Sequence, residues 1–231
     1  MGESPRHQPS FTWDVSLPKS GASALGRRKP LGIVLVRSEA RGEESLSVPV
    51  AVARRLAAGR KAGRIDPASR NELVFLMGGI TDRCVTLKVE ELVGKRDYSS
   101  LELAERLRRD GYPASTVDKA VARALDCHLV DDDRFADVFI RSKVSQGWGR
   151  IKIERELEGH GIEPSSVVGW PESYLSEDSE DDAAFELASR RRLTGTRDFE
   201  KIVRFLCSRG YSVGVATGAA RRVLSDVDND D

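Results

Sequence analysis

Five basic side chains gather in residues 141–155 against a single acid, Glu154. They are Arg141, Lys143, Arg150, Lys152 and Arg155. A turn at Gly147-Trp148-Gly149 separates two predicted helices, so cations from both helix ends can converge on one surface. Such a surface suits nucleic-acid phosphates or an acidic groove on a protein. The alternative is a solvated helix face whose charges pair along the sequence, for example Arg155 with Glu158.

A second basic group lies about 50 residues further on, and it comprises Arg190, Arg191, Arg192, Arg197, Arg204 and Arg209. A curved array of helices can present both groups on its concave side. We therefore count Arg191, Arg204 and Arg209 with the candidate binding residues.

Trp148 lies between two glycines in the turn of the first basic group. It can stack on a base or dock in a partner pocket, which makes it a further candidate for binding. The alternative is that it fills the joint between two helical units.

Other patterns that could carry chemistry are weaker. Asp131, Asp132 and Asp133 could suggest a metal-dependent nuclease, but carboxylates at a helix start also cap its free N–H groups. Cys127-His128 lacks a second pair at zinc-ligand spacing, and the sequence has no phosphate-binding Gly-x-x-x-x-Gly-Lys-Ser/Thr loop. We expect no catalytic residues, no metal and no cofactor.

One short pattern occurs three times at nearly equal spacing and indicates the elements that position these residues. Gly111, Gly161 and Gly210 are 50 and 49 residues apart. Each follows a leucine by four residues and precedes a large apolar residue. This spacing predicts tandem helical units, with each glycine in the left-handed conformation just past a helix end.

The predicted fold is all-α: tandem three-helix repeats forming an elongated, curved module, with a disordered or extended N-terminal segment. The expected divisions are a disordered extension (1–45), a helical extension (46–79), three repeats (80–128, 129–180 and 181–225) and an acidic tail (226–231).

Finer expectations concern individual segments. Within 1–45, only Ile33–Val36 resembles a strand. Gly78-Gly79 is expected to end a helix, and the first repeat then begins with a helix over Thr81–Lys95 that has Cys84, Leu87 and Leu92 facing inward. Residues 176–182, which are acidic, are expected to form a loop.

Composition limits the compartment and the binding mode. Lys and Arg total 37 and Asp and Glu total 37, so any affinity for nucleic acid must come from local patches. The three cysteines are odd in number and far apart, and no apolar run approaches membrane-spanning length. We expect a reducing, cytoplasmic compartment and no membrane association.

A particular series of residues resembles the signature of the RecX family, which contains bacterial regulators of the RecA recombinase. It begins with Leu129-Val-Asp-Asp-Asp-Arg-Phe-Ala136 and continues with Phe139-Ile-Arg-Ser142, Gly147-Trp-Gly149 and Arg155-Glu-Leu157. Its motif residues are Asp131, Asp132, Arg134 and Phe135. The resemblance covers roughly residues 80–225. Trp148 replaces the usual tyrosine, and the first eighty residues match nothing in the pattern.

The resemblance implies a protein that binds along the groove of the RecA filament on single-stranded DNA. It also implies inhibition of RecA ATP hydrolysis and strand exchange without catalysis by the regulator, which we expect to be a monomer. Capping, groove filling and filament disassembly remain open as modes of inhibition. The rivals are a helical nucleic-acid-binding protein that acts independently of RecA, and a scaffold for an unrelated helical protein.

Overall fold

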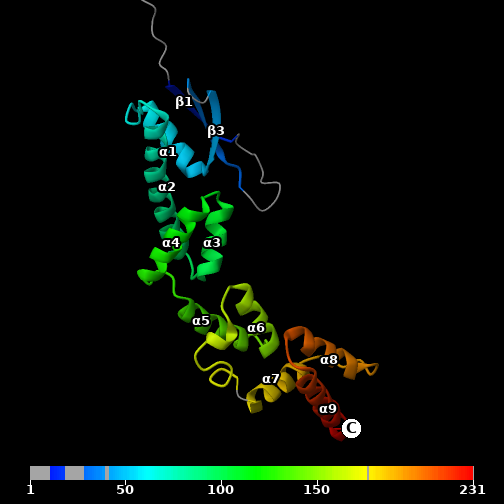
Figure 1. Ribbon diagram of the computed structural model, residues 1–231. Coiled ribbons are helices and arrows are strands. Elements are labelled where there is room, and N and C mark those ends of the chain that lie inside the picture. Colours follow the sequence, from blue (N-terminus) through cyan, green and yellow to red (C-terminus); the bar gives the residue numbers. More distant parts are fainter. Residues whose placement is uncertain (1–10, 19–28, 40–41, 176, 231) are drawn as a thin grey trace, which may run out of the picture. The chain divides into compact units, whose positions relative to one another are not determined.

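The computed structural model describes residues 11–18, 29–39, 42–175 and 177–230. The chain divides into two compact units (Figure 1). Unit 1 comprises Met1–Tyr98 and Glu102–Val130, and unit 2 comprises Ser99–Leu101 and Asp131–Asp231. The fold is mostly helical, as predicted, with a small sheet in unit 1.

The sheet of unit 1 contains three antiparallel strands in the order β1-β2-β3. They are β1 (Phe11–Ser16), β2 (Gly32–Ser38) and β3 (Gly42–Val48). Trp13 pairs with Val36, and Val34 pairs with Leu46. Because alternate side chains of a strand point to opposite faces, these apolar residues share the face that packs against the helices.

The sequence predicted a disordered or extended segment over 1–45. The described parts of this segment are extended, as predicted. They form strands of a sheet, so the expectation of disorder is wrong for them. β1 is separated from β2 by a long connection, and a single sequence does not reveal such a pairing. Residues 1–10, 19–28 and 40–41 lie outside the described ranges.

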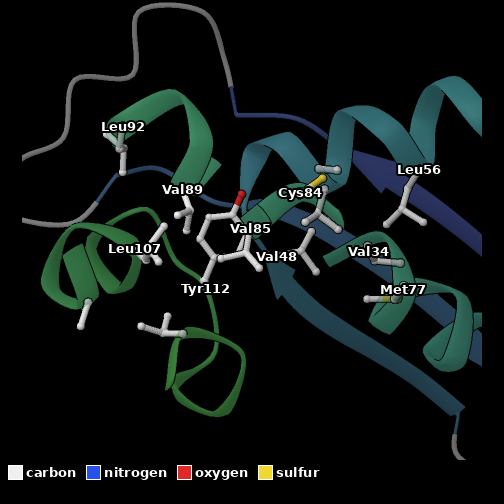
Figure 2. Close-up of a cluster of buried hydrophobic side chains, with 14 of the residues drawn as sticks. Val34, Val48, Leu56, Met77, Cys84, Val85, Val89, Leu92, Leu107 and Tyr112 are labelled. Carbon is white, nitrogen blue, oxygen red and sulfur yellow. The ribbon is translucent and has the colours of Figure 1, made fainter. Parts of the chain in front are cut away.

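Four helices complete unit 1: α1 (Val50–Lys61), α2 (Arg70–Val93), α3 (Ser100–Arg109), whose first residues group with unit 2, and α4 (Ala114–Asp126). Their apolar faces and the inner face of the sheet form one core (Figure 2). Tyr112 belongs to this core, and burial raises the pKa of its hydroxyl well above the ordinary value.

Helix α2 corrects two expectations. It continues through Gly78 and Gly79, where the sequence predicts that a helix ends. Interior glycines cost roughly 1 kcal/mol each relative to alanine, and burial of Leu73 and Met77 on the same helix offsets this cost. Leu87 is 45% exposed rather than inward, whereas Cys84 and Leu92 are buried as predicted.

Unit 2 contains α5 (Asp132–Ser145), α6 (Arg150–Gly159), a short 3₁₀ helix η1 (Pro164–Ser166), α7 (Glu177–Ser189), α8 (Asp198–Arg209) and α9 (Val213–Asp230). Its apolar residues form two clusters. Ile140, Ile153 and Leu157 centre one cluster on α5 and α6, and Ile202 and Leu206 belong to the other, on α7 to α9.

Three predicted features of unit 2 are wrong in detail. The second repeat has only η1 and turns where a third helix was expected. Residues 177–182 begin helix α7 instead of forming a loop, while residue 176 lies outside the described part. Residues 226–230 continue α9 rather than forming a separate tail. An acidic first turn is compatible with a helix, because carboxylates favour its positive end.

The prediction for the three repeat glycines is confirmed. Gly111, Gly161 and Gly210 have φ of 91°, 78° and 96° and lie one or two residues past the ends of α3, α6 and α8. Among the described residues, no helix is both long and apolar enough to cross a membrane.

Candidate functional site

The aspartates at the start of α5 have structural partners. Asp131 caps the helix by accepting a hydrogen bond from the backbone N–H of Arg134, at 2.9 Å. Asp132 accepts instead from the backbone N–H and the hydroxyl of Ser100, at 2.7 and 2.6 Å. The cap prediction therefore holds for Asp131, whereas Asp132 binds the first residue of α3. Phe135, which follows, stacks on Phe139 with ring centroids 6.0 Å apart.

The start of α6 meets the end of α8 at a close contact between two backbones, which we call the Gly149–Gly210 joint. The Gly149 N–H donates to the Arg209 carbonyl at 3.0 Å, and the Ile151 N–H donates to the Gly210 carbonyl at 3.1 Å. A Cβ on Gly149 would lie 2.5 Å from the backbone nitrogen of Tyr211. Only glycine permits this approach, so the joint fixes where α6 begins relative to α8.

Two lysines lie over the indole ring of Trp148, next to this joint. The Lys152 ammonium is 3.9 Å from the ring centroid, and the Lys143 ammonium is 4.6 Å from it. Lys143 is also 5.3 Å from the ring of Phe139. We call Phe139, Lys143, Trp148 and Lys152 the Trp148 cluster. Lys143, Trp148 and Lys152 are half-buried, so each lysine–ring contact is worth about 0.5–2 kcal/mol, and it orients the ammonium without neutralising it.

A similar arrangement lies on the third repeat. Arg191 and Arg209 are 4.2 and 5.5 Å from the ring of Phe205, and these three residues form the Phe205 cluster. Arg209 also donates to the backbone carbonyl of Gln146, in the turn before Trp148, at 3.3 Å. This hydrogen bond attaches Arg209 of the Phe205 cluster to the turn that carries Trp148.

Arg141 is bound differently, although it is only two residues from Lys143. Its guanidinium donates to Asp137 at 3.0 Å, and the hydroxyl of Tyr174 donates to the same carboxylate at 2.8 Å. Arg141 also lies 5.2 Å from the Tyr174 ring centroid. The hydrogen bonds from Arg141 and Tyr174 hold the pKa of Asp137 below its usual range. The carboxylate neutralises Arg141.

Arg150 has an equivalent partner. It donates to Glu154 at 2.8 Å, and the indole N–H of Trp170 donates to the same oxygen at 3.1 Å. The hydrogen bond to Glu154 raises the pKa of Arg150. The backbone N–H of Arg150 donates to Glu180 on α7 at 3.3 Å. Trp170 and Tyr174 thus attach the irregular segment 167–175 to α6 and α5 through two carboxylates.

The nine candidate residues therefore fall into three groups. Lys143, Trp148, Lys152, Arg191 and Arg209 form the two linked clusters. Arg141 and Arg150 are held by carboxylates. Arg155 and Arg204 are exposed, and no ion pair or ring contact with either is found among the described residues. The pairing of Arg155 with Glu158, which was the example for the alternative of a solvated helix face, is not among the ion pairs of the described residues.

Sequence reasoning did not assign Phe139 and Phe205 to the site. Phe139 shares Lys143 with Trp148, whereas Phe205 contacts Arg191 and Arg209. A signal for them was available, because Phe139–Lys143, Trp148–Lys152 and Phe205–Arg209 are all spaced i, i+4 on or beside a helix. The ring of Trp148 packs against the core of the second repeat, and Lys143 and Lys152 lie beside it. Trp148 can therefore fill space between helices and belong to the binding surface at the same time.

The fold and this site define a mostly helical, repeat-built protein that presents cations beside aromatic rings. A family model described as "RecX, second three-helix domain" matches residues 131–167. Regulatory protein RecX of Halorhodospira halophila is 30% identical over 142 residues, which cover 58% of this chain and 85% of the relative. The Chromohalobacter salexigens protein of the same name is 34% identical over 122 residues, 52% of this chain and 80% of the relative. The chain belongs to the RecX family.

Solved structures agree on the fold. A crystal structure of regulatory protein RecX has a TM-score of 0.54 at 14% identity and covers 79% of this chain and 90% of that one. The crystal structure of RecX from Lactobacillus salivarius has a TM-score of 0.53 at 13% identity. The match covers 62% of this chain and 96% of that one.

Proposed function

We propose that this chain binds the RecA filament on single-stranded DNA and inhibits its ATP hydrolysis, strand exchange and coprotease activity. The chain would thereby modulate recombination and DNA repair. Membership of the RecX family supports a regulatory role, and the relatives are named regulatory proteins. The chain acts as a monomer and reaches single-stranded DNA through the filament. A DNA-bound target places this activity in the cytoplasm.

The observation that carries the proposal is the pair of lysines over Trp148. Lys143 and Lys152 come from different helices, and their ammonium groups lie at the same ring, beside the Gly149–Gly210 joint. Neither has an ion pair among the described residues. Two oriented, unneutralised cations suit either the phosphates of the filament's DNA or an acidic groove of its protein. Arg209 extends this surface onto the next repeat.

The proposed role is binding rather than catalysis. Asp131 and Asp132 are occupied by backbone and hydroxyl donors. No group of three or more histidine, cysteine or acidic side chains suitable for a metal occurs within the described ranges. Inhibition would then require the chain to occupy filament sites, so its extent should follow the ratio of chain to filament.

RecA ATPase on single-stranded DNA, titrated with the purified chain, tests the proposal. We expect turnover to fall as chain is added and to saturate near full occupancy of the filament. Addition to preformed filaments, compared with addition before RecA, separates disassembly from blocked growth. Unchanged turnover at a several-fold excess of chain over filament sites would contradict the proposal. DNA binding without RecA that weakens steeply with salt, alongside unchanged turnover, would favour the RecA-independent rival.

A further inference from the structure

Helix α1 of unit 1 is strongly basic, a feature that the proposed function does not use. Residues 50–65 contain five cations and no acid. The cations are Arg54, Arg55, Arg60, Lys61 and Arg64, and all five are exposed. In a chain with no net charge, such a concentration on one short element is a local patch of positive potential.

The helical period divides α1 into two faces. Val52, Ala53, Leu56 and Gly59 are buried against the sheet and α2. Arg54, Arg55 and Lys61 lie on the opposite face, together with exposed or half-buried alanines. Arg54 and Lys61 are seven residues apart, which is about 10 Å along the helix axis. Arg64 lies three residues past the end of α1.

Four of these cations have no ion-pair partner among the described residues. Only Arg60 is paired, with Asp14, and it also lies 5.3 Å from the ring of Trp13. The remaining four are Arg54, Arg55, Lys61 and Arg64.

Acids of neighbouring elements are already occupied. Arg54, Glu91 and Asp110 all line one cavity of about 280 Å³. Glu91 pairs with Lys88 and Lys95, whose hydrogen bonds lower the pKa of its carboxyl to about 2. Asp110 pairs with Lys29 at 2.7 Å. The positive face of α1 is therefore not neutralised by the acids beside it.

We propose that the exposed face of α1, with Arg54, Arg55, Lys61 and Arg64, binds the phosphate backbone of nucleic acid. Phosphate contacts from arginine and lysine side chains supply the sequence-independent part of nucleic-acid binding. No aromatic residue occurs within residues 50–65, so this surface contacts phosphates and does not stack on bases. It also has no large exposed apolar residue to insert into a lipid surface.

This surface belongs to unit 1, whereas the residues proposed to bind the RecA filament belong to unit 2. The surface acts on nucleic acid directly. Its test therefore uses no RecA. The test variant is R54Q/R55Q/K61Q/R64Q. The matched control is R108Q/R109Q/K119Q/R123Q, which removes four exposed charges from the same unit, at positions next to Asp110, Asp118 and Asp126. A third variant, R54K/R55K/K61R/R64K, keeps the charge and changes the side chains.

Binding is measured by fluorescence anisotropy with a labelled duplex and a single strand of about 30 nucleotides, over about 50–200 mM salt. We expect the test variant to bind at least about tenfold more weakly than the parent. Its plot of log affinity against log salt should be shallower by about 3, because up to four phosphate contacts are lost at about 0.9 each. The control and the charge-keeping variant should stay within about threefold of the parent.

Equal weakening of the test and control variants would overturn the proposal, because only net charge would then matter. An unchanged salt slope in the test variant would also overturn it, as would a parent that binds neither nucleic acid. Binding that depends on α1 but occurs only to anionic vesicles or polyglutamate would assign the face to another class of partner. Circular dichroism checks the fold, and retained binding by the charge-keeping variant shows that the helix tolerates substitution. Because unit 2 is unchanged, inhibition of RecA by the same variants is a separate readout.

Discussion

Arg141 and Lys143 are two residues apart on α5, and Arg150 and Lys152 are two residues apart on α6, yet the arginines and the lysines have different surroundings. Each arginine has a carboxylate four residues away, Asp137 or Glu154, and pairs with it. Each lysine instead has an aromatic ring four residues away, Phe139 or Trp148. A carboxylate neutralises the cation, whereas a ring orients the cation and leaves its charge available.

Within this one basic stretch, the two arginines therefore have a structural role, and the two lysines are the candidates for binding a partner. The carboxylates that bind the arginines also accept from Tyr174 and Trp170, so the arginines help hold segment 167–175 in place. Within the described part of the chain, Lys143 donates only to Gln146 in the adjacent turn, at 3.5 Å, and no side-chain hydrogen bond of Lys152 is found. A count of charges along the sequence treats all four residues alike, and the residue four positions away separates them.

The position of Lys152 depends on Gly210, and Gly210→Val is expected to have the largest effect on stability. A Cβ there would overlap the Cβ of Lys152 and lie 2.6 Å from its backbone nitrogen, at a φ of 96°. Left-handed strain and overpacking together should cost about 2–4 kcal/mol. Gly195→Val is the control, since Gly195 has a φ of 76° with nothing within 4 Å, and it should cost only about 1–2 kcal/mol.

Urea unfolding in a Trp13→Phe background measures both variants. The remaining tryptophans, Trp148 and Trp170, lie in unit 2, so fluorescence reports that unit. Equal costs for the two valine substitutions would show that the Gly149–Gly210 joint adds nothing to the backbone strain.

R141Q/R150Q tests the structural half of the comparison. Without the arginines, Asp137 and Glu154 lose the partners that orient them toward Tyr174 and Trp170. We expect amide hydrogen exchange in segment 167–175 to become at least about threefold faster. K143Q/K152Q, which removes the same charge from the same two helices, should leave this exchange unchanged. Equal exchange in both variants would remove the distinction between the two pairs.

Lowering the pH should affect the arginine–carboxylate pairs but not the lysine–ring contacts, and this effect is expected to be smaller. The folded pKa of Asp137 is lowered, so its contribution to stability is present above the ordinary aspartate pKa of about 3.9 and is lost as pH falls through the folded value. The deficit of D137N relative to the parent should therefore shrink between about pH 6 and pH 3.

K143Q/K152Q serves as the comparison in the same pH series. Its deficit should stay constant, because a lysine–ring contact contains no carboxylate to protonate. Thermal unfolding across the pH series measures both differences, and a D137N deficit that is undiminished at the acid end would contradict the assignment of Asp137.

The sequence predicted features that depend on neighbours along the chain. Gly111, Gly161 and Gly210 stop helices because a local conformation needs glycine, and that need is visible in the spacing. The Asp131 cap is equally local. The candidate cations of the second repeat were identified for the same reason, since their density is a property of one short stretch.

Features that depend on distant residues could not be predicted in this way. β1 pairs with β2 across a long connection, and Gly78-Gly79 stays helical because tertiary burial outweighs a local preference. Arg209 reaches the carbonyl of Gln146 only through the Gly149–Gly210 joint. The i, i+4 spacing in the sequence could have predicted which cations pair with a carboxylate and which lie beside a ring. It could not have predicted that Tyr174 and Trp170 bind the same carboxylates.

The most direct test of the account compares K143Q/K152Q with R141Q/R150Q in parallel titrations of RecA ATPase on single-stranded DNA. Both variants lose two positive charges from the same helices, so net charge is matched. We predict that K143Q/K152Q needs at least about tenfold more protein than the parent for half-inhibition, which corresponds to about 1.4 kcal/mol. R141Q/R150Q should stay within about threefold of the parent. Equal loss in both variants, or a greater loss in R141Q/R150Q, would contradict the claim that the Trp148 cluster binds the filament.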